Sequence, residues 1–360
     1  MKKTILHIIP DLTHGGAEVM LMKVLKELTE YRNIVITLNP KNHFGKDFVC
    51  DEFYCFQMGS FSNLASAVIK LRKFIKANKI DLVHSHLFAA TLVARFALPA
   101  KMPLITTIHT NVSASNEYKK WYLRLLEKIS YKKHKSTIIG VSPAVLDLYF
   151  KFFGHKPYKK YLLYTFVDMR EIANSATPEA HRANNTFRLV AIGALRYPKN
   201  QQYLIRAFEK LKGRNFELHI YGTGVQKGEL EQLIAVTGGN VLLKGEVKNA
   251  SGLLKQYDLY VMPSEFEGFS LSVLEAMAME IPMLISDIPS FREQCADTAI
   301  FFDLKRTDDF IVKLEELAAN KEKRDRLVAS AKQRVLDNFT LEHHMAGLRK
   351  IYTETIDQQT

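Results

Sequence analysis

Cysteine is scarce in this chain of 360 residues. Cys50, Cys55 and Cys295 form neither an even disulfide framework nor the two closely spaced pairs that are typical of a zinc site. We therefore expect no disulfide bonds and no cysteine metal centre. A reducing cytoplasm is the compartment that this cysteine usage predicts.

Long apolar runs are also missing. The first apolar run ends at Pro10 and Asp11 after six residues, too short for the apolar core of an export signal or for a membrane span. No low-complexity tract and no short-period repeat is present. We expect a soluble chain, and its length and 47% hydrophobic content predict two domains with ordinary packed cores.

Acidic residues are scarce in the N-terminal half of the chain but not in the C-terminal half. Residues 1–165 contain 25 basic against 11 acidic side chains, whereas residues 166–360 contain 25 against 27. The basic excess concentrates in residues 117–135 and 151–161. In the first segment, apolar side chains recur among the lysines at helical spacing, and these are Trp121, Tyr122, Leu125, Leu126 and Ile129.

Three interpretations of this basic segment stay open. It can be a core-facing helix with a solvated lysine face, an amphipathic helix on an anionic membrane surface, or a nucleic-acid surface. We expect no nucleic-acid partner, because no recognisable nucleic-acid-binding motif accompanies the charge.

Short apolar runs rich in Ile and Val alternate with helix-like stretches along the chain, which is typical of parallel sheets covered on both faces. The predicted strands are 5–9, 34–38, 82–84, 104–108, 137–141, 189–192, 218–221, 241–243, 259–262, 283–286 and 299–302. The predicted fold class is therefore α/β, with two Rossmann-like domains. We place them at residues 1–170 and 187–340, with the polar segment 174–186 as the linker.

Ligands of such sheets bind beyond the carboxyl ends of the strands, so the strand-to-helix loops hold the candidate site. The first loop carries Gly15 and Gly16 ahead of an apolar helical stripe. Glycines there let backbone amides approach a phosphate or a sugar at the positive end of the helix. A plain tight turn would have the same sequence, and the spacing of a dinucleotide fingerprint is absent.

The segment from Pro263 to Asp287 reads as a strand end, a loop and an apolar helix that begins about Ser270, and it carries two glutamates. Glu267 lies in the loop and Glu275 a little over one turn into the helix. A carboxylate can accept the paired donors of a ribose diol, and the first-turn amides are donors for an anion. The alternative makes both glutamates solvated charges, but the apolar neighbours of Glu275 disfavour it.

Arg196 and Lys199 lie in the loop after the strand 189–192, ahead of a helix that starts near Asn200. Arg can bind a diphosphate with two hydrogen bonds, and Lys adds a point charge. Such a pair is often only solvated surface charge. Its place after the first strand of the second domain favours stabilisation of a departing nucleoside diphosphate.

In their order along the chain, these motifs resemble the family-4 glycosyltransferases of the two-Rossmann-domain GT-B architecture. The segments that carry the resemblance are HIIPDLTHGGAE, DLVHSHL, TIHTN, VSPAV, GALRYPKN and PSEFEGFSLSVLEAMA, of which the last is the most specific. The resemblance implies two domains facing across a cleft. It also implies a hexosyltransferase-type enzyme that transfers a sugar from a nucleotide donor with retention of configuration, without a metal or other cofactor.

The resemblance implies roles for individual residues. Glu275 would bind the donor ribose, Glu267 the donor sugar, and Arg196 with Lys199 the diphosphate. The implied donor-binding set is Gly15, Gly16, Arg196, Lys199, Glu267, Gly268, Phe269, Ser270, Leu271 and Glu275. The implied catalytic set is His109, Glu267, Arg196 and Lys199, in which His109 would reach the donor sugar.

His84 and His86 are two apart and so share one face of a strand, as metal ligands could. No third ligand is evident from the sequence. We interpret both as structural or as lining the ligand-binding edge, and we expect no metal.

Three positions depart from the family pattern. Ala194 stands where many members carry Arg, a role that we assign to Arg196, and Thr165 replaces an Asn. Glu280 replaces a glycine at the end of the two-glutamate helix, where a left-handed cap favours glycine. We expect that helix to end differently, with Pro282 enforcing the stop.

The resemblance also suggests partners. The donor would be a nucleotide sugar, with UDP the most common nucleotide, and the acceptor a saccharide. A lipid-linked saccharide of bacterial surface-polysaccharide assembly would place the enzyme in the cytoplasm, as a peripheral protein at the inner face of the cell membrane. By the same resemblance, the segment from about 341 to 360 would be a helix packed on the first domain.

Two alternative functions stay open. A nucleotide-sugar epimerase of the same architecture would convert the donor without any transfer. A noncatalytic nucleic-acid binder would use the basic half of the chain.

Overall fold

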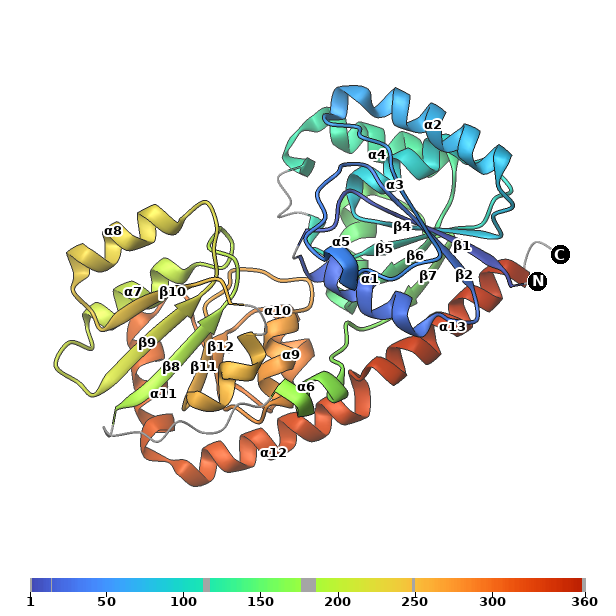
Figure 1. Cartoon of the computed structure of the whole chain (residues 1–360). Coiled ribbons are helices and arrows are strands. Elements are labelled where there is room, and N and C mark those ends of the chain that lie inside the picture. Colours follow the sequence, from blue (N-terminus) through green and yellow to red (C-terminus); the bar gives the residue numbers. More distant parts are fainter. Residues whose placement is uncertain (1, 14, 113–116, 176–185, 248–249, 358–360) are drawn as a thin grey trace. The chain divides into compact units, whose positions relative to one another are not determined.

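The computed structural model describes all residues except 1, 14, 113–116, 176–185, 248–249 and 358–360. It divides the chain into two compact units, one formed by residues 1–165 and 342–360 and the other by residues 166–341. Each unit is a parallel α/β structure (Figure 1), so the predicted fold class is confirmed. Most of the expected linker lies outside the described residues.

The first unit is built on a seven-stranded parallel sheet with the order β3-β2-β1-β4-β5-β6-β7. Its strands are β1 (Thr4–Ile9), β2 (Arg32–Thr37), β3 (Glu52–Cys55), β4 (Leu82–His86), β5 (Leu104–Ile108), β6 (Thr137–Gly140) and β7 (Lys159–Leu162). Its helices are α1 (Gly16–Glu27), α2 (Leu64–Ala77), α3 (Phe88–Ala97), α4 (Trp121–Lys133), α5 (Pro143–Phe153) and α13 (Leu341–Asp357). Short 3₁₀ turns are η1 (Gly45–Asp47), η2 (Phe61–Asn63) and η4 (Glu117–Lys119).

The alternation of side chains along β1 separates two faces of this sheet. Leu6 and Ile8 pack into the core under α2 and α3, whereas His7 points to the opposite face. Helices α1 and α13 cover that opposite face (Figure 1). Helix α13 is tied to the unit by the Nδ1 of His344, which donates to the carbonyl of Tyr164 at 2.7 Å.

The second unit is built on a six-stranded parallel sheet with the order β10-β9-β8-β11-β12-β13. Its strands are β8 (Phe187–Ile192), β9 (Phe216–Tyr221), β10 (Val241–Gly245), β11 (Leu259–Met262), β12 (Met283–Ser286) and β13 (Ile300–Phe302). Its helices are α6 (Met169–Ser175), α7 (Gln201–Glu209), α8 (Lys227–Thr237), η5 (Ala250–Gln256), α9 (Leu271–Ala278), α10 (Pro289–Cys295), α11 (Thr307–Ala319) and α12 (Lys321–Asn338).

The eleven predicted strands all have counterparts, and two further strands were missed. These are β3 and β7, which form the two edges of the first sheet. Along both, side chains are only partly buried, and Tyr54 and Leu162 are about two-fifths exposed. A prediction that looked for continuous apolar runs could not find them, because edge strands need no such runs.

The end of α9 corrects one expectation. Glu280 adopts the left-handed conformation, with φ of +59°, that a glycine would take at this position. The amide of Glu280 donates to the carbonyl of Met277, and the amide of Ile281 donates to that of Ala276, which is the Schellman pattern. The helix therefore ends as glycine-capped helices do, and the expectation of a different ending was wrong.

Helix α4 corrects a second interpretation. Four of the five apolar side chains expected to face the core are exposed: Trp121 is 73% exposed, and Tyr122, Leu125 and Ile129 are between 42% and 48% exposed. The helix does pack on the core, through Leu123 and Tyr131, so the core-facing interpretation is wrong only for these four exposed side chains. In the part of the chain that the structure describes, none of the helices combines the length and apolar character needed to span a bilayer.

Candidate functional site

The candidate donor site of the second unit begins with an ion pair between two of the predicted residues. The loop after β8 carries Lys199, whose Nζ lies 2.6 Å from the Oε1 of Glu267 in the loop after β11. Only 16% and 13% of these side chains are exposed. The hydroxyl of Ser264 donates to the same carboxylate oxygen at 2.8 Å. The two predicted motifs thus meet at the carboxyl edge of the sheet.

The same two loops are joined through their backbones and aromatic rings. The amide of Glu265 donates to the carbonyl of Pro198 at 3.0 Å. The rings of Tyr197 and Phe266 lie edge to face, with centroids 5.6 Å apart. Strand order explains the meeting, because β8 and β11 are neighbours in the parallel sheet and their loops leave at the same edge.

Two glycines after β9 hold the Lys199 loop and were not singled out from the sequence. A Cβ on Gly222 would lie 2.0 Å from the carbonyl oxygen of Gly193, and one on Gly224 would lie 2.3 Å from that of Leu195. Both have positive φ, of +145° and +159°. Only glycine permits this close approach of two backbones. A Gly-x-Gly directly after a predicted strand was the signal that could have identified them.

Arg196 differs from Lys199 in its surroundings. Its side chain is exposed, and among the described residues it has no hydrogen bond or ion pair. Gly193 lies beneath the Lys199 stem, since a Cβ there would sit 3.5 Å from the lysine Cε. The loop after β8 thus carries Lys199, which is already paired, and Arg196, whose side chain is free to bind an anion.

The start of α9 provides fewer free donors than the sequence predicted. Ser270 is the N-cap residue, and its amide donates to the Oε1 of Gln294 at 3.0 Å, while Nε2 of Gln294 donates to the carbonyl of Ser270 at 2.7 Å. The amides of Leu271 and Ser272 follow in the first turn, where helix geometry offers no intrahelical acceptor. Gly268 and Phe269 are buried before the cap.

Glu275 occupies the partly open side of α9. The residues around it, Val273, Leu274, Ala276 and Met277, are fully buried. Its charge and that of Glu267 both act on the buried hydroxyl of Tyr260. Burial first, and these two carboxylates next, hold the pKa of Tyr260 well above its usual range, against a hydrogen bond to Ser272 that lowers it. Both glutamates therefore lie near enough to one buried tyrosine to raise its pKa.

In the first unit, Gly15 is the N-cap of α1 and Gly16 its first residue. A Cβ on Gly15 would lie 2.3 Å from the Oε2 of Glu18, a side chain that is 93% buried, since its exposure is 7%. The missing side chain of Gly15 thus leaves room for a carboxylate at the positive end of α1. An anionic ligand at Gly15 would be repelled by the Glu18 carboxylate.

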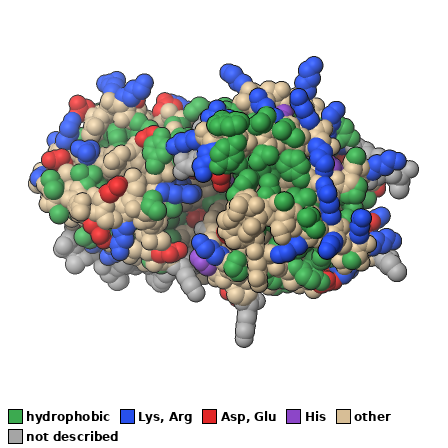
Figure 2. All heavy atoms as spheres, turned by 90° about the horizontal axis from the view of Figure 1, so that it is seen from above, with side chains coloured by type: hydrophobic (Ala, Val, Ile, Leu, Met, Phe, Trp, Pro, Cys, Tyr) green, Lys and Arg blue, Asp and Glu red, His purple; other side chains and the backbone are tan. Residues whose placement is uncertain are grey.

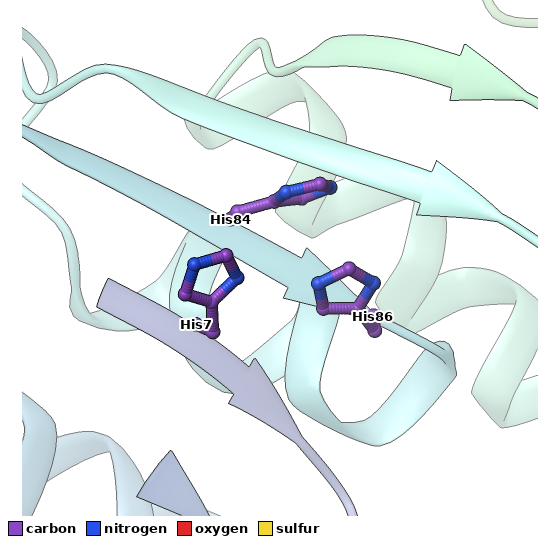
Figure 3. Close-up of side chains that lie close together, drawn as sticks. All are labelled: His7, His84 and His86. Carbon is purple, nitrogen blue, oxygen red and sulfur yellow. The ribbon is translucent and has the colours of Figure 1, made fainter. Parts of the chain in front are cut away.

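Histidines gather on the α1 face of the first sheet, as Figure 3 shows for three of them. His7 of β1 pairs in register with His84 of β4, and one nitrogen each of His7, His84 and His86 lies within 4.8 Å of the others. His109 follows β5, with its Nε2 3.4 Å from the Nδ1 of His86. With His344 of α13 they line a cavity whose free volume of about 20 Å³ admits roughly one water molecule.

These histidines are neutral. Burial lowers the pKa of His7, and likewise of His109 and His344, from 6.5 to about 4. Burial and the neighbouring imidazoles hold the pKa of His84 and His86 well below the usual range. The Nδ1 of His7 and the Nε2 of His86 have no hydrogen-bond partner among the described residues.

The cluster contains the third histidine that the sequence did not reveal, but it suits a divalent metal poorly. Both nitrogens of His84 are engaged, Nδ1 with the hydroxyl of Tyr352 and Nε2 with that of Thr107, each at 2.7 Å. None of the described residues that line the cavity is acidic. A cation would therefore displace a hydroxyl and be buried without a neutralising carboxylate.

Two family models match the chain. The model for glycosyl transferases group 1 matches residues 175–334, and that for glycosyltransferase family 4 matches residues 14–171. The chain is 23% identical over 328 residues to the O-antigen biosynthesis glycosyltransferase WclY of Escherichia coli, covering 85% of this chain and 86% of that one. It is 26% identical over 304 residues to the uncharacterized glycosyltransferase MJ1607 of Methanocaldococcus jannaschii, covering 78% and 75%.

Solved structures share the fold over nearly the whole chain. Anabaena Alr3699/HepE, in complex with UDP and glucose, superimposes with a TM-score of 0.82 at 18% identity, covering 97% of this chain and 99% of that one. Sucrose-phosphate synthase from Thermosynechococcus elongatus superimposes with a TM-score of 0.82 at 15% identity, covering 99% and 100%.

Proposed function

Because the chain belongs to the group 1 glycosyltransferases of GT-B architecture, we propose that it transfers a hexose from a UDP-sugar to a saccharide acceptor with retention of configuration. The observation that carries the proposal is the paired Lys199 and Glu267 beside the start of α9, with the free cation Arg196 in the same loop. A nucleoside diphosphate needs such cations, and its ribose and sugar hydroxyls need carboxylate acceptors.

In the proposed reaction, an acceptor hydroxyl attacks the anomeric carbon from the face that the diphosphate leaves. The new carbon–oxygen bond forms as the bond to the phosphate oxygen breaks, and that oxygen takes the acceptor proton. Arg196, Lys199 and the first-turn amides of α9 stabilise the charge on the leaving UDP. Within the second unit, Glu275 holds the ribose and Glu267 contacts the transferred sugar.

No metal is required in this scheme, because side-chain cations and backbone amides supply the positive charge that a metal would otherwise provide. At Gly15 and Gly16 we place the acceptor and not the donor phosphates, because the Glu18 carboxylate beside Gly15 can accept from sugar hydroxyls and repels phosphate. Transfer that falls in EDTA and recovers with a divalent ion would contradict this part of the proposal.

For the acceptor, we propose a lipid-linked saccharide of bacterial surface-polysaccharide assembly. Relatives named for O-antigen biosynthesis support this class of acceptor. Assembly on a lipid carrier would keep the enzyme in the cytoplasm at the inner face of the membrane.

The test is a thermal-shift series with UDP, UDP-glucose and other nucleotide sugars, followed by transfer assays with the best donor. We expect stabilisation by UDP, and a product with the donor's anomeric configuration by NMR. Glu275→Gln should weaken UDP binding, since a neutral amide accepts from the ribose diol less strongly. An inverted product would refute retention, and conversion of the donor without an acceptor would favour the epimerase alternative.

A further inference from the structure

Helix α4 differs from an ordinary surface helix, because it buries a charged side chain on its inner side and exposes large apolar side chains on its outer side. Its inner side buries Glu127, which is 1% exposed and pairs with the fully buried Arg95 at 2.5 Å. The hydroxyl of Tyr149 donates to the same carboxylate oxygen at 2.5 Å. A buried ion pair thus anchors the helix together with the buried Leu123 and Tyr131.

The outer side of α4 is apolar. Trp121, Tyr122, Leu125 and Ile129 recur at intervals that form one stripe along a helix, and all four are exposed. A contiguous exposed stripe of large apolar side chains marks an interaction surface, because single exposed residues would be scattered. We refer to these four side chains as the α4 stripe.

Basic side chains flank the α4 stripe on both sides. The exposed cations in residues 117–135 are Lys119, Lys120, Arg124, Lys128, Lys132, Lys133 and Lys135. Glu117 is the one exposed acidic residue of this segment, because Glu127 is buried against Arg95. Figure 2, viewed from the side on which α2 and α4 lie, shows hydrophobic side chains gathered on this face among Lys and Arg.

We propose that the α4 stripe docks on an anionic lipid membrane surface. Trp and Tyr prefer the interfacial zone of a bilayer, and flanking lysines are attracted by anionic headgroups. A second copy of the chain is a poor occupant, because a symmetric contact would bring two sets of cations together. The charge also disfavours a basic protein partner.

The position of α4 connects this surface with the carboxyl edge of the first sheet, where the proposed function places the acceptor. The ring of Tyr118, three residues before Trp121, packs edge to face on Phe88 with centroids 4.8 Å apart. Phe88 begins α3 two residues after His86, at the carboxyl end of β4. Membrane docking through α4 would therefore bring this edge of the sheet near a lipid-linked saccharide, and only this consequence rests on the proposed function.

The chain offers its own probe, because Trp121 is its single tryptophan. The full-length protein is mixed with vesicles of phosphatidylcholine alone or with one third phosphatidylglycerol, without donor or acceptor. We expect a blue shift of the tryptophan emission and co-sedimentation with the anionic vesicles only, both reduced at high salt. Brominated lipids should quench the emission, because Trp121 would lie in the interfacial zone.

Two variants separate charge from apolar contact. The triple variant Lys119→Glu, Lys120→Glu and Lys128→Glu should weaken vesicle binding by at least 100-fold, on the order of fivefold for each lysine lost and more for reversal. The double variant Leu125→Ser and Ile129→Ser should weaken it at high salt as well, since it removes apolar contact.

The matched control reverses three exposed lysines of the second unit, Lys212→Glu, Lys244→Glu and Lys305→Glu. It changes the net charge by the same amount and should leave vesicle binding within about threefold of the unaltered protein. Far-UV circular dichroism and the melting temperature serve as a folding check on every variant.

Three results would overturn the proposal. These are no vesicle binding at low salt, equal loss in the control and the triple variant, or unchanged Trp121 emission in the bound state. Concentration-dependent dimerisation that Leu125→Ser abolishes would assign the stripe to a second copy instead. Vesicle binding needs no sugar transfer, so its failure and failure of the glycosyltransferase assay are distinguishable.

Discussion

Replacement of Lys199 by methionine removes one partner of the ion pair at the candidate donor site and keeps most of the side-chain volume. Glu267 then retains only the hydroxyl of Ser264 among its described hydrogen-bond donors. A hydrogen bond to a charged group contributes roughly 1.5–3 kcal/mol. Because both side chains are about 85% buried, water replaces little of this, and we expect a loss of about 2 kcal/mol in the free energy of unfolding.

A loss of this size should lower the melting temperature of the second unit by roughly 4–8 °C. The same variant should weaken UDP binding about 30-fold and slow transfer by about 10² to 10³. Glu267→Gln should act oppositely on UDP: it removes a negative charge near the diphosphate, so UDP should bind more tightly while transfer falls. Calorimetry with UDP and a steady-state transfer assay measure both effects.

The matched control is Lys210→Met, which breaks an exposed pair with Asp308 in the same unit. Exposed pairs contribute about 0–1 kcal/mol, so stability and UDP binding should change little. The reasoning fails if Lys199→Met behaves like this control. It also fails if Glu267→Gln weakens UDP binding as strongly as Lys199→Met does.

Three further predictions concern the backbone and the histidine cluster. Glu280→Gly should raise the free energy of unfolding, measured by urea titration, by about 0.5–1 kcal/mol, because glycine adopts the φ of +59° at this position without strain. The ion pair with Lys332 that the variant loses is exposed and contributes little. An unchanged or lower free energy of unfolding would contradict the cap assignment. Gly222→Ala should weaken UDP binding more than about tenfold by displacing the Gly193 loop, and unchanged binding would show that this loop is not part of the donor site. The pKa of His7 is about 4 in the folded protein and 6.5 in the unfolded chain. The part of the folding stability that depends on a neutral His7 is therefore fully present above pH 6.5 and is lost as the pH falls toward 4. Between about pH 7 and pH 5 this loss is about 2 kcal/mol. The free energy of unfolding of His7→Leu in urea should therefore fall by about 2 kcal/mol less over this range than that of the unaltered protein, and an equal fall in both would refute the prediction.

The fold could be predicted from the sequence because parallel strands covered on both faces must be apolar along their whole length. The same rule explains the failure at β3 and β7, which lie at the sheet edges and keep exposed side chains. The loops of the candidate site followed from the fold, since parallel strands deliver their outgoing loops to one edge. Arg196, Lys199, Glu267 and Glu275 were predicted in this way.

The hydrogen bonds and close contacts of the candidate site residues could not be predicted equally well. The amide of Ser270 was expected to face an anion, but Gln294, 24 residues further on, occupies it. The clash that keeps position 222 a glycine involves the carbonyl of Gly193. Both contacts depend on how separate loops pack, and no local sequence pattern encodes such packing.

By itself, the sequence determined the α/β class, two parallel sheets and the loops that carry the cations and carboxylates, because all of these follow from local periodicity and chain order. Tertiary structure alone decided three further features. His7 faces His84 because β1 and β4, far apart in the chain, are register neighbours. The apolar stripe of α4 faces outward because Arg95 holds Glu127 inside. Lys199 pairs with Glu267 because β8 and β11 are adjacent, and a strand order of this kind is set by long-range packing.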